Sequence, residues 1–289
     1  MSAITDKPAA SDNPAWALRA PGGLPARLGK YGAVLQMSIT NNIAYAGEVL
    51  FRGLFLVVLV FVFIQLWQTM YGVLGVPTIG GYTISQMIWY FAFAEAIVLS
   101  APRLANRIDQ EVKSGDLAYR LNKPYNYVLY LAADYLGERL VRFALCLLIG
   151  TSLCVLLVGP LGFSLAGVLA TLLLVLGAWA LDFLVVCALG LLAFWVEDTF
   201  AFILIYSRLL LLLGGTMVPL QIFPDWIRQI AEWLPFSYIV YGPARSWVQF
   251  DPGFFGDMLL RQSVTLLVLA AVVTAIFRAG TRRVNINGG

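Results

Sequence analysis

Six long apolar blocks, separated by polar segments, constrain the fold of this chain more than any other feature. They cover residues 53–71, 85–101, 143–158, 166–196, 200–220 and 258–277. The hydrocarbon core of a bilayer is about 30 Å thick and needs roughly 20 residues of helix to cross it. The blocks are unbroken runs of Leu, Val, Ile and Phe, without the alternating pattern of a membrane β-barrel strand. The sequence therefore predicts an all-α polytopic membrane protein with six transmembrane helices.

The composition excludes several other classes of protein. Apolar residues make up 60% of the chain and charged residues 12%, whereas soluble domains contain roughly 25% charged residues. There is no histidine, which excludes a His-ligated metal and a Ser-His-Asp triad. Net charge is only +3, which gives no indication of a nucleic-acid partner. The first block begins too far into the chain for a cleaved signal peptide, and the cysteines Cys146, Cys154 and Cys187 all lie inside predicted spans.

The basic residues indicate the orientation of the chain in the membrane. Lys and Arg are frequent before the first block, in the segment 102–142 (which includes Arg139) and after the last block, but residues 71–83 and 159–165 contain none. Because loops rich in Lys and Arg stay in the cytoplasm, both termini and the segment 102–142 are predicted to be cytoplasmic. We expect a multi-pass protein of the inner (plasma) membrane.

The residues before the first span divide into two parts. Residues 1–25 are rich in Pro, Ala, Ser and Gly and predict a flexible cytoplasmic tail. Residues 26–50 predict an interfacial helix that leads into the six-helix membrane domain at 51–289; a solvated helix or loop is the alternative. One side of this helix would be apolar, formed by Leu28, Tyr31, Val34, Leu35 and Met37 or Ser38.

The segment 221–256, between the fifth and sixth blocks, predicts short helices on the outer face. After Pro224-Asp225, apolar residues including Trp226 and Trp233 recur at helical spacing. Pro235 is expected to end this helix, and a second apolar stretch, 236–241, which includes Tyr238, is expected to stop at Gly242-Pro243. Trp and Tyr favour the level of the lipid headgroups. We expect re-entrant or surface helices here, with a simple loop as the alternative.

No motif for catalysis or nucleotide binding is present in the sequence. Gly29-Lys30 is followed by Tyr31 and lacks the glycine spacing and the Ser or Thr of a Walker A sequence. There are no paired carboxylates, CxxC pairs or G-x-S-x-G turn. The chain is therefore not expected to be an enzyme or to hold a metal or cofactor of its own.

The segment 102–142 has the most informative pattern outside the apolar blocks. Leu104, Ile108 and Val112 form an apolar line at helical spacing, and Ser114-Gly115 then breaks the helix. Asp116 is placed to cap a new helix, which is only a turn or two long before Asn122-Lys123-Pro124. Apolar residues at helical spacing resume from Tyr127. The pattern predicts a short cytoplasmic helix held between two longer arms; an ordinary loop with a helix break is the alternative.

This order of elements resembles the permease subunit of the second large class of ABC exporters, the type-two ABC transporter permease family. Residues 108–124 (IDQEVKSGDLAYRLNKP) are similar to the family's E-[IV]-x-x-G-x-L-x-x-x-L-x-x-P run. Residues 234–244 (LPFSYIVYGPA) are similar to its L-P-[FL]-[ST]-Y run after span five. The likeness extends over nearly the whole chain, through the order and topology of its elements more than through either motif.

The resemblance implies that the short helix after Gly115 is a coupling helix that contacts a separate cytosolic ATPase. Its expected parts are a turn at Gly115, a cap at Asp116, leucines that fill a groove on the partner, charged residues at the rim and a proline stop. In this sequence these are Glu111, Gly115, Asp116, Leu117, Arg120, Leu121 and Pro124.

The resemblance also implies the partners and cofactors. ATP and Mg²⁺ would bind to the partner ABC ATPase subunits, and a second permease chain, the same or different, would complete the membrane half. Transport would proceed by alternating access. The apolar spans and the lack of a large soluble binding domain favour an amphipathic or lipid-like cargo, with membrane lipid around the permease.

Three ionisable residues fall inside predicted spans: Glu95, Asp182 and Arg208. Charges at such depth are costly and normally face the interior of the bundle, paired or hydrated. Glu95 and Arg208 would lie at similar depth, with Asp182 somewhat deeper, which predicts a pair between Arg208 and one carboxylate. Such a pair would serve substrate binding or gating, or it would be a structural ion pair between helices.

Two other classes of function stay open from the sequence. A secondary transporter would use Glu95, Asp182 and Arg208 as an ion relay, although the chain lacks the internal duplication that such folds often show. The third class is a non-transporting membrane assembly or signalling subunit. A neighbouring gene with a Walker A sequence would favour the ABC permease.

Overall fold

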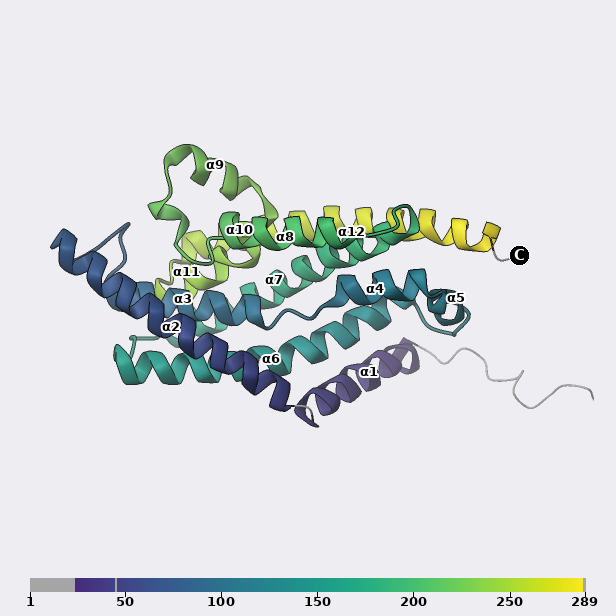
Figure 1. Ribbon diagram of the computed structural model, residues 1–289, viewed down its shortest axis with the longest axis horizontal. Helices are drawn as coiled ribbons and strands as arrows, with labels where there is room; N and C mark the ends of the chain where they lie inside the picture. Colours follow the sequence, from purple (N-terminus) through teal and green to yellow (C-terminus); the bar gives the residue numbers. More distant parts are fainter. Residues whose placement is uncertain (1–23, 45, 288–289) are drawn as a thin grey trace, which may run out of the picture.

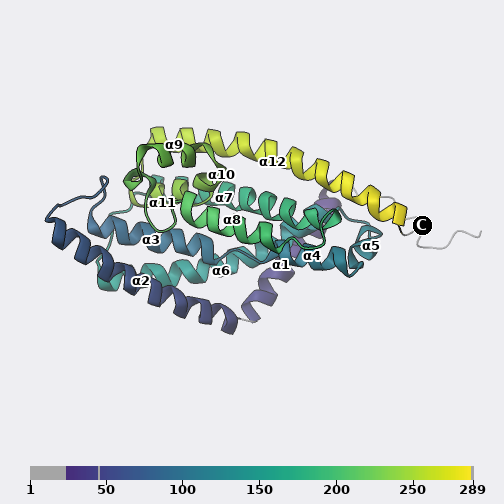
Figure 2. The same cartoon turned by 45° about the horizontal axis from the view of Figure 1, so that its top comes forward.

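The computed structural model describes residues 24–44 and 46–287, and its regular structure is helical throughout (Figures 1 and 2). This confirms the predicted all-α class. The predicted tail, residues 1–25, lies outside the described residues except for its last two. The α-helices of the described residues are α1 (Leu24–Ala44), α2 (Ala46–Leu74), α3 (Ile84–Leu99), α4 (Leu104–Lys113), α5 (Asp116–Leu121), α6 (Tyr127–Leu157), α7 (Leu165–Leu191), α8 (Phe200–Leu213), α9 (Asp225–Trp233), α10 (Pro235–Ile239), α11 (Tyr241–Val248) and α12 (Pro252–Asn287).

Within the described residues, five helical segments are long and apolar enough to cross a membrane. They are Gly53–Leu74, Ile84–Lys113, Tyr127–Leu157, Leu165–Phe194 and Pro252–Arg282. The predicted fifth block, 200–220, forms α8, which has only 14 residues. At 1.5 Å per residue such a helix is about 21 Å long, shorter than the hydrocarbon core. The six-span count therefore stays a prediction.

The end of α8 has a local cause that the hydropathy of the block does not reveal. Gly215 has a φ of 69°, a left-handed conformation that glycine adopts at little cost and that ends a helix. The Tyr90 hydroxyl of α3 donates a hydrogen bond to the Gly215 carbonyl (2.5 Å). The chain therefore turns back into the bundle at this point.

Helix α6 begins well before the apolar block that predicts it. The Asn126 side chain accepts a hydrogen bond from Leu129 N (3.1 Å) and caps the helix. The whole stretch from Tyr127 onward is then one continuous helix. Arg139, assigned from the sequence to the cytoplasmic segment, is instead buried inside the bundle with 1% of its surface exposed.

Helix α1 packs along the first half of α6 (Figure 1). Ser38 donates a hydrogen bond to the Asp134 carbonyl (2.8 Å). A Cβ on Gly137 of α6 would lie 2.7 Å from the Ser38 Cβ, so the close approach requires glycine. Of the predicted apolar side, Ser38 is buried whereas Met37 is 66% exposed. In this chain that side packs against protein.

The helices place the short elements at opposite ends of an elongated bundle (Figures 1 and 2). Helix α5 and the end of α12 lie at one end, which we call the α5 end. Helices α9–α11 and the turn between α2 and α3 lie at the other, the α9 end. Helix α3 lies in the core, with every side chain from Met87 to Ile97 buried against α2, α6 and α11.

Short helices follow α8 as predicted, but there are three of them, α9, α10 and α11, where the sequence predicts two, and their limits differ. Helix α9 begins after Pro224 as expected, but Pro235 is the first residue of α10. Gly242 and Pro243 lie in the first turn of α11 and do not end a helix. Proline is tolerated there because the first amides of a helix have no intrahelical partner. Both α10 and α11 are largely buried and pack against α7 and, for α11, α3.

Candidate functional site

A buried ion pair joins four helices in the half of the bundle toward α5. Arg139 of α6 is paired with Asp182 of α7, and the exposed fractions of their side chains are 1% and 2%. The hydroxyls of Tyr135 (2.6 Å) and of Tyr206 on α8 also donate to this carboxylate. Arg139 donates in addition to the Ile97 carbonyl of α3 (3.1 Å). Through these contacts the pair connects α6, α7, α8 and α3.

This cluster corrects the predicted pairing of the intramembrane charges. Asp182 has Arg139 as its cation, so the predicted pair with Arg208 is wrong. Arg208 is exposed on α8, because that helix turns its Tyr206 face toward the bundle. Glu95 is buried with 5% exposed, and no described residue offers it a hydrogen bond or an ion pair. The three residues therefore do not form one site.

The joint between α4 and α5 contains the glycine that the sequence predicts. Gly115 has a φ of 80° and directly precedes α5, which confirms a left-handed turn at this position. Asp116 is not the cap, however. It is the first residue of α5, and its carboxylate accepts a hydrogen bond from the Ser114 hydroxyl (2.8 Å). The glycine backbone alone redirects the chain here.

Glu111 is the centre of the contacts that hold α5 in place. Its side chain accepts hydrogen bonds from Arg107 (3.1 Å) and from the Tyr127 hydroxyl of α6 (2.8 Å). Its carboxylate is also paired with Arg120 of α5 (3.1 Å). Glu111 is 7% exposed, so it does not lie at the rim of a docking surface as predicted. Its contacts tie α4, α5 and α6 into one unit.

The exposed and buried residues of α5 are also different from the prediction. Leu117, expected to fill a groove on a partner, is 2% exposed and packs inside this chain. Leu121 is partly buried against the same core. Tyr119 is 69% exposed, with the Lys123 ammonium 4.7 Å from its ring centre. The large side chain that α5 exposes is therefore Tyr119.

Helix α1 contacts the chain that leaves α5. The Lys30 ammonium donates a hydrogen bond to the Pro124 carbonyl (2.8 Å). The Tyr31 hydroxyl accepts one from the Asn126 amide (3.0 Å). Pro124 follows the end of α5 as predicted, and its carbonyl serves as an anchor for α1.

A second set of contacts connects α4 with the start of α8. The buried Thr199 hydroxyl donates to Asp109 Oδ1 (2.8 Å). The Lys113 ammonium lies 2.7 Å from Asp109 Oδ2 and 3.6 Å from Asp198 Oδ1. Asp198 in turn accepts a hydrogen bond from the first amide of α8, that of Phe200 (3.0 Å). These contacts join α4 to the first turn of α8.

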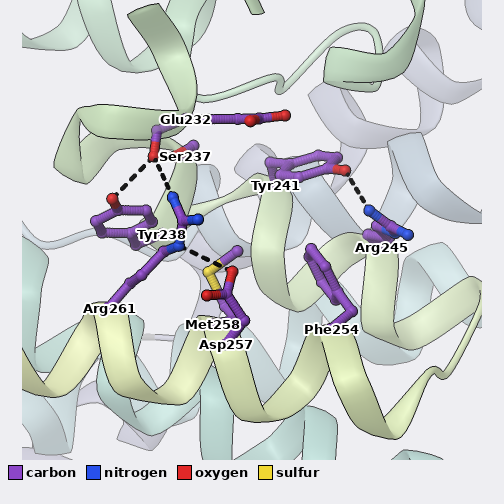
Figure 3. A pocket seen from close by; sticks show the side chains of 9 residues that line it. All are labelled: Glu232, Ser237, Tyr238, Tyr241, Arg245, Phe254, Asp257, Met258 and Arg261. Carbon is purple, nitrogen blue, oxygen red and sulfur yellow. Dashed lines mark hydrogen bonds and ion pairs between the residues drawn. The ribbon is translucent and has the colours of Figure 1, made fainter. Parts of the chain in front are cut away.

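At the α9 end, a pocket of about 140 Å³ lies between α9–α11 and the first turns of α12 (Figure 3). Ser237, Tyr238, Tyr241 and Met258 are its buried lining residues. Arg245 donates a hydrogen bond to the Tyr241 hydroxyl (2.9 Å). Burial raises the pKa of Tyr241, so this phenol stays protonated at neutral pH. Helix α9 beside the pocket exposes Trp226 and Trp233.

Sequence reasoning missed the cation of the buried pair and the exposed aromatic of α5. Tyr135 and Arg139 are four residues apart and share a face of α6, a signal that was present in the sequence but was obscured by the assignment of Arg139 to a loop. Tyr119 lies between the two leucines of the predicted motif, and spacing alone did not show which side of so short a helix is exposed.

Comparison with known proteins identifies one family for this chain. The family model described as ABC-2 family transporter protein matches residues 54–288, which is most of the chain and includes the helices from α3 to α12 in full. A search of curated proteins found no match.

Proposed function

The chain belongs to the ABC-2 family of transporter proteins and, from that membership, we propose that it is the transmembrane permease subunit of an ATP-driven export system. Partner ABC ATPase subunits bind ATP and Mg²⁺ and dock at the α5 end. Their cycle drives alternating access of the membrane half. The protein is itself a membrane transport component and not a catalyst.

The observation that carries this proposal is the way in which α5 is presented. A helix of six residues has little stability of its own, yet α5 is braced by Glu111, Tyr127 and the buried Leu117. It exposes Tyr119 at the end of the bundle. Exposed tyrosines held on a rigid element are typical anchors of protein interfaces. We infer that α5 is the coupling helix of the ATPase contact.

The contacts of α4 supply a route from that interface into the membrane. Because Asp109 and Lys113 bind the residues before α8, movement of α5 and α4 displaces the first turn of α8. Because Tyr206 of α8 donates a hydrogen bond to Asp182, this movement of α8 in turn displaces the pair of Asp182 and Arg139. In this proposal the buried pair holds one state of the bundle together.

The proposed topology has both termini and α5 in the cytoplasm and α9–α11 outside, in the inner membrane. The Lys and Arg of residues 102–124 and of the end of α12 lie at the α5 end, as the positive-inside rule requires. Helix α8 completes six membrane elements. A second permease chain, the same or different, covers its exposed side, since Arg208 on that side is costly in contact with lipid.

Copurification with an ABC ATPase, sought first among the products of the neighbouring genes, tests the proposal. We expect the two proteins to form a complex in nanodiscs that hydrolyses ATP faster than the ATPase alone. Tyr119→Ala should lower the stimulation about tenfold or more, as loss of an interface anchor does. Trp233→Ala is the matched control, because Trp233 is 82% exposed at the opposite end.

Normal stimulation of the ATPase by well-expressed Tyr119→Ala protein would show that α5 is not the coupling element. Absence of any complex with the wild-type chain would reject the permease proposal itself.

A further inference from the structure

Arg245 is a cation without a carboxylate in the pocket at the α9 end. Within residues 24–44 and 46–287, no Asp or Glu oxygen lies within 4.0 Å of its guanidinium. Its Nη1 donates to the Tyr241 hydroxyl (2.9 Å), while its Nε is buried and has no hydrogen-bond partner. Arg245 therefore lines the pocket with hydrogen-bonding capacity that the described residues leave unused.

The other two arginines at this end are neutralised. Arg261 is paired with Asp257 (2.8 Å) and also donates to the Glu232 carbonyl (3.1 Å), as Figure 3 shows. Arg228 of α9 is paired with Asp225 (2.8 Å) and lies 3.9 Å from Glu232. The acidic residues around the pocket are therefore already engaged, and Arg245 keeps its full charge.

The ring of Phe254 fixes the orientation of this guanidinium. The Arg245 Cζ lies 4.0 Å from the ring centre, a stacking distance at which Arg is attracted to an aromatic face. Since Nη1 points to Tyr241, the edge formed by Nε and Nη2 is left without a partner. That edge is the one that binds a carboxylate or a phosphate with two parallel hydrogen bonds.

The surface beside the pocket is apolar and would suit the apolar part of a ligand whose carboxylate or phosphate binds Arg245. Tyr241 and Met258 line the pocket and are buried. Helix α9 beside it exposes Trp226, Ile230 and Trp233, the side chains expected at the level of the headgroups. A ligand with an anionic head and an apolar tail would place both parts favourably.

We propose that the pocket between α9–α11 and α12 is a binding site for the oxyanion headgroup, phosphate or carboxylate, of an amphiphile at the outer face of the membrane. Arg245 binds the oxyanion through its Nε–Nη2 edge, and Phe254 and Tyr241 hold the guanidinium in place. The assignment to the outer face rests on the proposed function; the binding chemistry rests on the pocket alone.

Thermal unfolding of the purified full chain in a neutral detergent tests this site, with dodecyl phosphate as the probe. We expect dodecyl phosphate to raise the Tm of the wild-type protein. Arg245→Gln should weaken the apparent affinity about 10- to 100-fold, since a hydrogen bond to a charged group contributes roughly 1.5–3 kcal/mol. Arg245→Lys should restore little of it, because lysine keeps the charge without the paired donors.

Arg228→Gln is the matched control, since it removes a positive charge at the same end but outside the pocket; it should bind dodecyl phosphate as the wild type does. Two further probes identify the source of the oxyanion. Competition by phosphatidylglycerol indicates a bilayer lipid as occupant, and binding of dodecyl phosphate without such competition indicates an exported amphiphile.

Equal stabilisation of wild type and Arg245→Gln by dodecyl phosphate would overturn the proposal. So would equal binding of inorganic phosphate, which has no apolar tail. The measurement uses the permease chain without ATPase, so the two proposals are tested separately. Failure to bind the amphiphile would contradict only the binding site, and failure to bind the ATPase would contradict only the coupling proposal.

Discussion

The buried carboxylate of Asp182 would destabilise the fold without partners, but its hydrogen-bond donors offset that cost. Its carboxylate would carry a large desolvation penalty in the interior, but Arg139, Tyr135 and Tyr206 all donate to it. The Arg139 guanidinium also lies near the faces of Tyr135 and Trp179, 5.4 and 5.7 Å from their ring centres. The cost of removing one member is therefore larger than the cost of removing the pair.

We predict that Arg139→Leu alone lowers the free energy of unfolding by about 3–5 kcal/mol, because it leaves Asp182 buried without its cation. The double variant Arg139→Leu/Asp182→Leu should recover much of this loss. Thermal unfolding in detergent, followed by tryptophan fluorescence, measures both. Arg278→Leu serves as the control and should leave the Tm unchanged, since Arg278 is exposed; additive losses in the double variant would contradict a coupled pair.

Glu111 supports a second residue-level prediction. Glu111→Ala removes the acceptor shared by Arg107, Arg120 and Tyr127, at a cost of about 1–3 kcal/mol for the buried donors. Hydrogen exchange in α5 should become faster while exchange in α3 stays slow. Asp116→Ala is the control, because Asp116 is exposed; unchanged exchange in α5 of Glu111→Ala would mean that Glu111 is not the brace.

The partners of individual charges were the part of the site that sequence could predict least. Depth along the spans placed Glu95, Asp182 and Arg208 together, but depth says nothing about which side of each helix faces the others. Arg139 was available at helical spacing from Tyr135, and only the early start of α6, capped by Asn126, places it in the interior.

At the scale of elements, close helix crossings depend on single glycines. Helix α4 approaches α7 at Gly190, where a Cβ would lie 2.8 Å from the Ile108 Cβ and 3.0 Å from the Ala105 carbonyl oxygen. Since α4 packs against α5 and contacts the residue before α8, this crossing determines where the α5 end of the molecule lies.

We predict that Gly190→Leu lowers the free energy of unfolding by about 1–3 kcal/mol through overpacking and reduces stimulation of the ATPase. Gly72→Leu is a matched control, because Gly72 is also helical and a Cβ added there would meet nothing within 4 Å; leucine at this position should be neutral or slightly stabilising. Comparable Tm values for the two variants would show that α4 and α7 can separate without penalty.

Helix α5 allows stability and docking to be distinguished within one element. Leu117→Asp should lower the Tm, since Leu117 is 2% exposed, whereas Tyr119→Ala should leave the Tm unchanged, since Tyr119 is 69% exposed. The burial of one aspartate without a partner explains the first effect. Unfolding curves for both variants measure the difference, and a stable Leu117→Asp protein would contradict the packing described here.

Most elements could be predicted from the sequence because their signals are local. Apolar runs predict α2, α3, α7 and α12, and the break at Gly115 predicts α5. The end of α8 and the course of α11 could not be predicted in the same way. Gly215 ends α8 inside the apolar block 200–220. Gly242 and Pro243 do not end a helix, because α11 begins at Tyr241, directly after Val240, and the proline therefore lies in its first turn.

At the scale of the whole molecule, the orientation in the membrane is the prediction on which the partners depend. Cysteine substitutions at Thr78 and Gly253 should react with a membrane-impermeant maleimide only from outside, and those at Gly115 and Asn287 only from inside. The native Cys146, Cys154 and Cys187 are buried and should give a low background. Labelling of the Gly115 site from outside would show that the orientation is the reverse of the proposed one. Helix α5 could then not contact a cytosolic ATPase.

The contact between α1 and α6 has a consequence for the time course of synthesis. Lys30, Tyr31 and Ser38 reach partners 94 to 96 residues later in the chain. At about 5–20 residues per second, α1 exists for roughly 5–20 s before those partners are made. In the proposed topology, we expect the apolar side of α1 to lie on the cytoplasmic surface of the bilayer during that interval. The interfacial position predicted from the sequence stays a prediction, and the contacts with α6 can form only once those partners are made.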